Sequence, residues 1–317
     1  MWLWPSSVII KPHGPSAAEL KTRMAEHHSA TWRPAGESDD TLVSFGGSSH
    51  RGAVRALNED SWLAQPPVFV VADGMGGHRA GDAASAIVVE RFMDLAGESP
   101  VELEAVQDCI GTCQREIEAL YDGTGAAPGS TLVAAVYLLQ GDAGYWLVAS
   151  IGDSRAYVSV DALLEQVTHD HTVVQELVDA GKLRPAEAPS HPERHVITRA
   201  LGAADDSSAD YSLIPVTGGS TLMLCSDGVS SELDDGTLAK LIGLGLGAQD
   251  TAERIVDSAV TAGGHDNATA IVIRVQGTAP RVETLGHVTP DEEAPAPAAV
   301  GAVGTSSPAD AGRPARS

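Results

Sequence analysis

The chain has 317 residues, of which 43% are hydrophobic and 20% charged, so it can bury a sizeable core in one large domain or two small ones. Its formal net charge of −23 argues against nucleic-acid binding and against attachment to an anionic membrane surface, since both need a basic face. Aromatic residues make up only 4%, so the core must consist mainly of Val, Leu, Ile and Ala.

The beginning of the chain has no sustained hydrophobic period. Residues 1–40 mix Pro, Ser, His and charge, which predicts a flexible N-terminal extension. No basic region precedes the apolar start, and no segment approaches the ~20 apolar residues of a membrane span. We therefore expect no membrane insertion and a cytoplasmic location. The three cysteines form no C-x-x-C pair, so we expect buried free thiols in a reducing compartment.

Short apolar or β-branched runs, bounded by turn residues, fill the middle of the chain. They predict strands over 67–72, 131–139, 145–150, 156–160, 221–225 and 268–275. Apolar residues at helical spacing predict helices over 83–95, 101–120 and 248–262. The first two helices follow one another, and several strands then follow through tight turns. This order argues against a doubly wound parallel sheet and favours an α+β fold with antiparallel sheets.

Two further segments are polar. Residues 168–201 are rich in His and Pro, lie between strand runs and contain a helical pattern over 172–180. Residues 278–317 are rich in Ala, Pro and Gly and cannot bury enough apolar surface to offset their ordering entropy, which predicts a disordered tail. The sequence therefore predicts one domain over 41–277.

Acidic motifs stand where the predicted strands end, and one precedes a strand. They are Arg55-Ala-Leu-Asn58-Glu59-Asp60, Ala72-Asp73-Gly74-Met75-Gly76-Gly77-His78, Gly152-Asp153-Ser154-Arg155, Ser226-Asp227-Gly228 and Asp266-Asn267. Glycine after aspartate lets the backbone turn sharply and approach a ligand. Carboxylates gathered at one sheet edge repel one another unless a cation neutralises them, and ligation by oxygen alone favours Mg²⁺ or Mn²⁺. A single Asp-Gly is also a common hairpin turn, so only the set is informative.

In this order the five motifs resemble those of the protein phosphatase 2C family of metal-dependent phosphatases, over about residues 43–276. The stretches Met75-Gly76-Gly77-His78 and Thr168-His169-Asp170-His171 resemble the bacterial members, which reverse serine/threonine protein kinases. The resemblance implies a four-layer αββα sandwich, with two antiparallel sheets flanked by helices and metals at one edge. It also implies that 168–201 is a flap-like segment beside the active site.

The resemblance implies metal ligands among the matching residues. Asp73 would bridge two ions, and the backbone carbonyl of Gly74 would join it on one of them. Asp227 and Asp266 would hold the other ion. Asp153, together with Asp227, would hold a third and weaker ion. The implied cofactor is Mn²⁺ or Mg²⁺.

Three other positions complete the implied site. Glu59 and Asp60 would act directly on the metals or through metal-bound water, and Arg55 would clamp the phosphate with its planar fork of donors. Some members of the family place a histidine directly after the Asp-Gly, but this chain has Met75, which cannot transfer a proton. His78 is expected to support the following helix, so protonation of the leaving group is expected to fall to a metal-bound water.

The expected function is hydrolysis of phosphoserine and phosphothreonine in proteins by a metal-activated water, without a covalent phosphoenzyme. The expected partners are phosphorylated proteins and a bacterial serine/threonine kinase, and the expected oligomeric state is a monomer. One alternative is a phosphatase of a phosphorylated anti-sigma-factor antagonist, although such relatives usually lack the flap. Another is a catalytically weak regulator that binds phosphoproteins, although the metal aspartates of this chain are all present.

Overall fold

The computed structural model describes residues 30–34, 41–76, 80–97, 101–141, 143–202 and 207–277. His78, most of the predicted N-terminal extension and the whole predicted tail lie outside the described residues.

Two antiparallel sheets form the centre of the molecule. The first has the strand order β1 (Ala30–Trp32), β2 (Leu42–His50), β12 (Ala268–Gln276), β11 (Thr221–Cys225), β8 (Arg155–Val160) and β9 (Leu163–Gln166). The second has the order β10 (Asp210–Pro215), β7 (Ala143–Ile151), β6 (Leu132–Gln140), β4 (Val68–Met75) and β3 (Asp60–Gln65), with β5 (Gly129–Ser130) pairing with β4.

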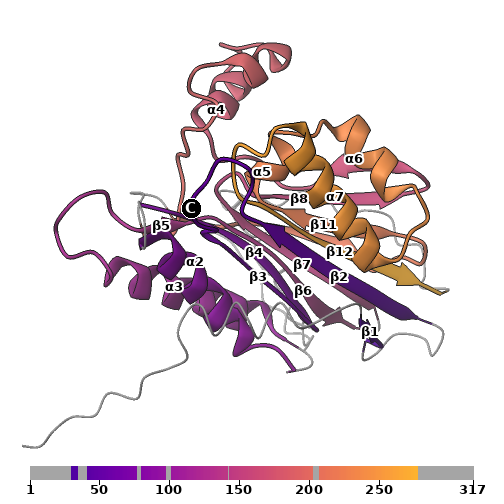
Figure 1. Cartoon of the computed structure of the whole chain (residues 1–317). Helices are drawn as coiled ribbons and strands as arrows, with labels where there is room; N and C mark the ends of the chain where they lie inside the picture. Colours follow the sequence, from indigo (N-terminus) through magenta and orange to yellow (C-terminus); the bar gives the residue numbers. More distant parts are fainter. Residues whose placement is uncertain are drawn as a thin grey trace, which may run out of the picture.

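Helices cover the outer face of each sheet (Figure 1). On the second sheet lie α2 (Ala80–Met93) and α3 (Leu103–Glu118), and on the first lie α6 (Asp235–Ile242) and α7 (Ala248–Ala262). A third apolar cluster fills the space between the two sheets. The predicted α+β fold and αββα sandwich are therefore confirmed. None of the helices in the described residues is both long and apolar enough to cross a membrane.

The hydrophobic pattern of each element matches the layers that it contacts. Residues 68–72 of β4 are all buried, because α2 covers one face of that sheet and the first sheet covers the other. On α3, Val106, Ile110, Cys113 and Ile117 recur at helical spacing and form the buried stripe. All three cysteines are free and buried, as predicted. Apart from a small set of buried aromatic rings, the core consists of aliphatic side chains.

Two predictions about local structure are wrong. Residues 30–32 fall inside the predicted flexible extension, yet they form β1 and pair with β2, because Trp32 packs edge-on against Tyr137 with ring centroids 5.2 Å apart. The Gly46-Gly47 pair predicts a turn, but both residues lie within β2. There the side chain of Gln249 on α7 accepts a hydrogen bond from the Gly47 N–H at 3.1 Å and donates one to its carbonyl at 3.0 Å.

The predicted flap-like segment stands away from the sandwich (Figure 1). It contains α4 (Val173–Asp179) and the 3-10 helix η1 (Pro185–Ser190). The helix predicted over 172–180 is confirmed, and Thr172 caps it by accepting a hydrogen bond from the backbone N–H of Gln175 at 3.2 Å.

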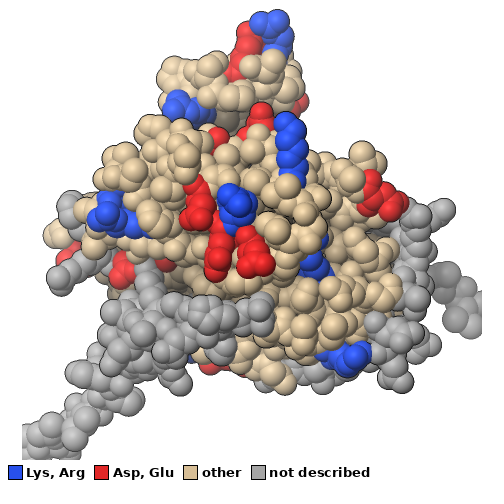
Figure 2. All heavy atoms as spheres, turned by 45° about the vertical axis from the view of Figure 1, so that its right-hand side comes forward, with Lys and Arg blue, Asp and Glu red and all other residues tan. Residues whose placement is uncertain are grey.

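The charged side chains of the described residues are dispersed on the face drawn in Figure 2. Lys and Arg stand apart from one another there, several beside Asp or Glu, so that face has no continuous basic patch.

Candidate metal centre

Pairing of β3 with β4 brings the first two aspartates together. Asp60 lies directly opposite Asp73 in the antiparallel register, and residues opposite one another in such a pair have neighbouring side chains. Asp60 is the first residue of β3, so the expectation that it follows a strand is wrong. Gly74 is necessary here, since an added Cβ would overlap the backbone carbonyls of Gly81 and Glu59.

The first sheet brings two more aspartates to the same end of the sandwich. Cys225, the last residue of β11, pairs with Ala270 near the start of β12, so the residues that follow β11 meet those that precede β12. Asp227 follows β11 as the first residue of the four-residue helix α5 (Asp227–Ser230), and Asp266 precedes β12. An added Cβ at Gly228 would overlap the Asn267 carbonyl, which explains the glycine after Asp227.

Asp153 lies in the turn that passes from one sheet to the other. Strand β7 belongs to the second sheet and β8 to the first, and Gly152 between them has a φ of +98°, a conformation that favours glycine. The turn is linked to Asp73 through Thr131. The Thr131 hydroxyl accepts a hydrogen bond from the Asp73 N–H at 2.9 Å and lies 2.8 Å from the Ser154 hydroxyl. Both sheets therefore contribute carboxylates to one site.

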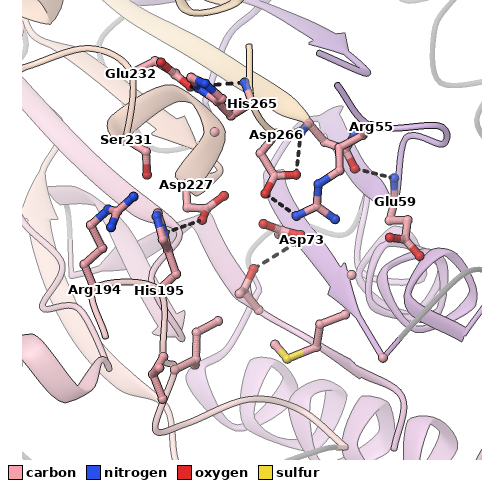
Figure 3. A pocket seen from close by; sticks show the side chains of 18 of the residues that line it. Arg55, Glu59, Asp73, Arg194, His195, Asp227, Ser231, Glu232, His265 and Asp266 are labelled. Carbon is pink, nitrogen blue, oxygen red and sulfur yellow. Dashed lines mark hydrogen bonds and ion pairs between the residues drawn. The ribbon is translucent and has the colours of Figure 1, made fainter. Parts of the chain in front are cut away.

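A cleft of about 1370 Å³ opens at this end of the sandwich. Of the eight residues that the sequence predicts for the site, six line the cleft: Arg55, Glu59, Asp73, Gly74, Asp227 and Asp266. The other two, Asp60 and Asp153, lie beneath it and are 2% and 7% exposed. Figure 3 shows Asp73 and Asp227 between residues of the flap on one side and Arg55 and Glu59 on the other.

Burial and mutual repulsion disfavour the charged form of these carboxylates. Burial raises the pKa of Asp60 to about 7, although hydrogen bonds from the hydroxyls of Thr269 and Ser226 act in the opposite direction. Burial, reinforced by the charges of Asp60 and Asp227, holds the pKa of Asp73 well above its ordinary value. Burial and the charge of Asp227 do the same to the pKa of Asp153. The protein alone supplies too little positive charge for this cluster.

The donor set fits hard cations. Asp60, Asp153 and Asp227 each have one buried carboxylate oxygen, Oδ1, without a hydrogen-bond partner in the structure. Buried unpartnered acceptors are costly, and ligation of Mg²⁺ or Mn²⁺ would satisfy them. Within the described residues, however, no three His, Cys, Asp or Glu side chains already have an arrangement that holds an ion.

Asp266 is already paired with a cationic side chain. Its Oδ2 accepts a hydrogen bond from Nη2 of Arg55 at 2.5 Å. The Arg55 side chain is 49% exposed, so its guanidinium is accessible from the cleft. Arg55, the predicted phosphate clamp, is therefore paired with Asp266, a predicted metal ligand.

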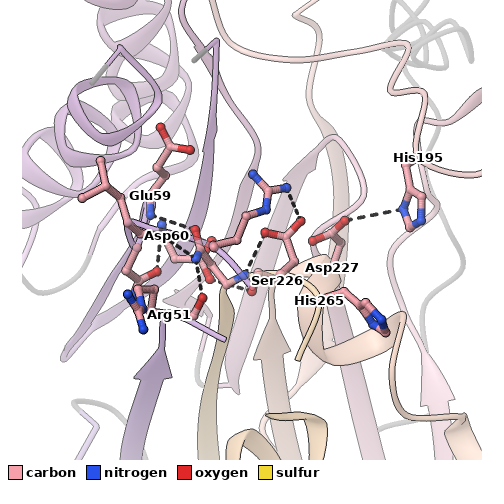
Figure 4. A network of polar contacts seen from close by, with 12 residues as sticks. Arg51, Glu59, Asp60, His195, Ser226, Asp227 and His265 are labelled. Atoms are coloured by element: carbon pink, nitrogen blue, oxygen red, sulfur yellow. Dashed lines mark hydrogen bonds and ion pairs between the residues drawn. The ribbon is translucent and has the colours of Figure 1, made fainter. Parts of the chain in front are cut away.

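Hydroxyl groups that the sequence analysis did not assign hold Asp60 in place. Oδ2 of Asp60 accepts hydrogen bonds from Ser226 at 2.8 Å and from Thr269 at 2.6 Å, and Figure 4 shows the contact with Ser226. The position of Ser130-Thr131 after Gly129 predicts only turn chemistry, but Thr131 connects Asp73 with the Asp153 turn. The only available signal was proximity to the acidic motifs, because these contacts depend on strand pairing.

Asn267 holds the segment that carries Arg55. Its Oδ1 accepts a hydrogen bond from the Glu59 N–H at 2.8 Å. Its Nδ2 donates to the carbonyls of Arg51 at 2.9 Å and Leu57 at 2.8 Å. One buried amide thus fixes both ends of the segment 51–59, which we call the Arg55 loop.

The flap places a histidine near the carboxylates. Nδ1 of His195 lies 3.9 Å from Oδ2 of Asp227, although the sequence analysis assigned no role to this residue. His171 instead anchors the base of the flap. Its Nδ1 accepts a hydrogen bond from the Gly152 N–H at 3.1 Å, and its Nε2 lies 3.1 Å from Asp210 on β10.

Known proteins resemble this chain in sequence and in fold. Residues 46–244 match the family model described as protein phosphatase 2C. The chain is 36% identical over 243 residues to the serine/threonine protein phosphatase PstP of Mycobacterium tuberculosis. That match covers 74% of this chain but 45% of the relative, so the chain spans about half the length of that protein. It is also 32% identical over 238 residues to the serine/threonine phosphatase stp of Listeria innocua, covering 70% of this chain and 92% of the relative.

A solved structure is similar over most of the sandwich. The catalytic domain of PstP in complex with two manganese ions superposes with a TM-score of 0.68 at 32% identity. The match covers 74% of this chain and 99% of that one. The family model spans well over half of this chain, and the Listeria relative is matched along nearly its whole length. The chain therefore belongs to the protein phosphatase 2C family.

Proposed function

We propose that this chain hydrolyses phosphoserine and phosphothreonine in proteins, using water activated at a binuclear Mn²⁺ or Mg²⁺ site, and that it opposes a bacterial serine/threonine kinase. The observation that carries the proposal is the group of buried carboxylates with unpartnered oxygens under an open cleft. The relatives named above as serine/threonine phosphatases support the substrate class.

Each side chain has a proposed place in the site. Asp73 and the Gly74 carbonyl are the inner ligands, and Asp227 and Asp266 complete the set on the side of the first sheet. Asp153 would join Asp227 on a third and weaker ion. Bound divalent cations supply two things in this chemistry: a lower pKa for water and neutralisation of the phosphate charge.

Arg55 and Asp266 are proposed to change partners when the site is loaded. A cation that binds Oδ2 of Asp266 competes with the guanidinium, since Arg55 donates its hydrogen bond to that oxygen. Arg55 is then available to bind two phosphate oxygens with its parallel N–H groups. Glu59 and Asp60 are proposed to orient water beside the ions, Asp60 from beneath the cleft. Met75 lines the cleft but cannot protonate the leaving serine or threonine oxygen, and we propose that water does so.

Metal dependence tests the proposal. The purified chain should hydrolyse p-nitrophenyl phosphate with Mn²⁺ and lose this activity in EDTA. Asp73→Asn should lower kcat at least a hundredfold, because it removes a charged ligand from the centre of the site. Asp235→Asn is the matched control, since Asp235 is an exposed aspartate on α6. Equal rates with Mn²⁺ and with EDTA would end the metal proposal.

The substrate class needs a separate measurement. The same phosphopeptide prepared with phosphoserine, phosphothreonine and phosphotyrosine should be hydrolysed in its first two forms and poorly in the third. A preference for phosphotyrosine would contradict the proposed class while leaving the metal chemistry intact.

A further inference from the structure

The rim of the cleft carries exposed apolar side chains on two sides. Leu57 on the Arg55 loop is 51% exposed and Val196 in the flap is 46% exposed, and both line the cleft. Val54, on the same loop, is 66% exposed. Single exposed apolar residues are common on protein surfaces. Here, however, they stand at the entrance to a charged site.

The two sides come from unrelated parts of the fold. Figure 3 shows the flap residues Arg194 and His195 on one side of the carboxylates and Arg55 and Glu59 on the other. Leu57 belongs to the second group by sequence and Val196 to the first. The cleft therefore combines an acidic floor with an apolar rim, which we call the apolar lips, defined by Leu57 and Val196.

Backbone hydrogen bonds hold both lips in place. The Leu57 carbonyl accepts a hydrogen bond from Asn267 at 2.8 Å. The Val196 carbonyl accepts one from the Val173 N–H at 2.9 Å, and the neighbouring Ile197 forms a bridge with Thr172. The backbone of both lips is thus held before any ligand binds, so little backbone ordering opposes contact with a partner.

The geometry of an extended peptide identifies what the lips would contact. Side chains alternate along such a peptide, so those two residues before and after a given position point in the same direction as the residue itself. When a phosphorylated side chain points to the cleft floor, the side chains at positions −2 and +2 face the rim. A substrate with apolar residues there would cover the exposed lips.

We propose that Leu57 and Val196 select phosphoproteins that carry apolar side chains two residues before and after the phosphorylated serine or threonine. This inference rests on the proposed phosphatase function and narrows its substrate class.

Two phosphopeptides of identical composition test the inference. The first has Leu at −2 and +2 and Ser at −4 and +4, and in the second these residues exchange places. The wild-type chain with Mn²⁺ should give a kcat/KM about tenfold higher for the first peptide, as expected for partial burial of two apolar side chains. Leu57→Ser and Val196→Ser should each reduce this ratio, and the double variant should bring it close to one, mainly through KM.

Controls separate this inference from the proposed function. Leu163→Ser changes a leucine on β9 that is 77% exposed and not part of the cleft, so the ratio should stay near its wild-type value. If the wild type fails to hydrolyse p-nitrophenyl phosphate, the proposed function is wrong. If it hydrolyses this compound but treats the two peptides alike, the selection by the lips is wrong and the function stands.

Two other occupants of the lips would give different results. If Leu57 and Val196 instead contact each other when the flap moves, the variants would change the rates for both peptides and for p-nitrophenyl phosphate in proportion. The ratio of kcat/KM between the two peptides would then stay unchanged. If a second copy of the chain covers the lips, the double variant would change the sedimentation coefficient and not the ratio. Either result would overturn the inference.

Discussion

Asp60 is a carboxylate whose charge depends on its neighbours. The side chain is 2% exposed, and burial favours its protonated form and raises its pKa to about 7. The hydroxyls of Thr269 and Ser226 lower its pKa by donating to the ionised form, so they make the carboxylate available to a cation or an ordered water. Catalytic competence at this position therefore depends on two residues that do not themselves face the cleft.

Thr269→Val should weaken metal binding. It removes the 2.6 Å hydrogen bond to Asp60 but keeps the shape of the side chain. The pKa of Asp60 should rise further, and a buried hydrogen bond to a charged group is worth about 1.5–3 kcal/mol. We expect at least a tenfold weaker Mn²⁺ affinity by calorimetry at pH 7, with kcat lowered in parallel.

A matched control separates this effect from simple loss of a hydroxyl. Thr261→Val on α7 removes a hydroxyl that donates only to the carbonyl of Asp257 in its own helix. Its Mn²⁺ affinity should match that of the wild type. If Thr269→Val also binds Mn²⁺ normally, the threonine does not tune Asp60.

The Arg55 loop is an element without regular secondary structure, and the Asn267 side chain holds it together with contacts such as the hydrogen bond from the Ala53 N–H to the Gly264 carbonyl at 2.7 Å. Asn267 bonds to three backbone groups of the loop, at Arg51, Leu57 and Glu59. Residues 53–57 are all exposed, so few packing contacts reinforce these bonds. The position of the guanidinium over the cleft therefore depends on this amide.

Asn267→Ala should loosen the loop while the sandwich stays folded. Backbone amides of 53–59 should exchange hydrogen faster, and KM for a phosphopeptide should rise several-fold because Arg55 no longer stands ready for the phosphate. Asn58→Ala is a useful comparison, since Nδ2 of Asn58 donates to Ser49, outside the loop. Unchanged exchange in Asn267→Ala would show that other contacts hold the loop.

Elements with a strong local pattern could be predicted from the sequence, and those that depend on distant partners could not. Helix α7 matches its expected range, because its apolar residues recur at helical spacing. Strand β1 was missed, since three residues without alternation give no signal until Trp32 meets the aromatic rings of another layer. The Gly46-Gly47 pair was misleading, because Gly46 lies against the backbone of Gln249 on α7 and Gly47 lies against the ring of Trp62 on β3.

The same distinction applies to the candidate site. Each acidic motif could be recognised locally as an aspartate beside a glycine or at a strand boundary. The opposition of Asp60 and Asp73 depends on the register of two strands, and the support from Thr269 depends on β12 reaching the same edge. Such contacts follow no periodicity in the sequence. The sequence therefore indicated which acidic residues form the site, but not which side chains hold them in position.

At the scale of the whole molecule, the site occupies one end of the sandwich and β1 the other. Strand β2 connects the two, since His50 pairs with Ala268 beside the site whereas Val43 pairs with Trp32. Stability and catalysis can therefore be perturbed separately along one strand.

Trp32→Ala should lower stability without changing catalysis. Truncating this half-buried ring removes contacts with Tyr137 and Trp146, at centroid distances of 5.2 and 6.5 Å, and should cost about 2 kcal/mol. A chain of this size loses about 2–4 °C in Tm per kcal/mol, so we expect a decrease of several degrees. kcat and KM measured well below the transition should match the wild type. A normal Tm would mean that β1 contributes little to the fold.

The net charge of −23 makes the whole chain sensitive to cations. In the cluster of buried carboxylates, this sensitivity should depend on pH. Burial raises the pKa of Asp60 from 3.8 to about 7, and the pKa values of Asp73, Asp153 and Asp227 shift in the same direction. Without metal, the folded state therefore binds protons more tightly than the unfolded state. The free energy of unfolding should fall as pH rises from about 4 to about 7.

Mn²⁺ competes with those protons, so the stabilisation that it provides should grow over the same pH range. The Tm in Mn²⁺ minus the Tm in EDTA should be near zero at pH 5. At pH 8 it should reach several degrees, because one ion at a hundred times its Kd adds about 2.7 kcal/mol. The hydrogen bond from His171 lowers the pKa of Asp210. Because Asp210 titrates in both samples, its contribution cancels from the difference in Tm. Asp73→Asn should abolish the difference and Asp235→Asn should retain it. An equal difference at pH 5 and pH 8 would place the cation away from the buried carboxylates, since only exposed ligands bind metal without releasing protons over this range.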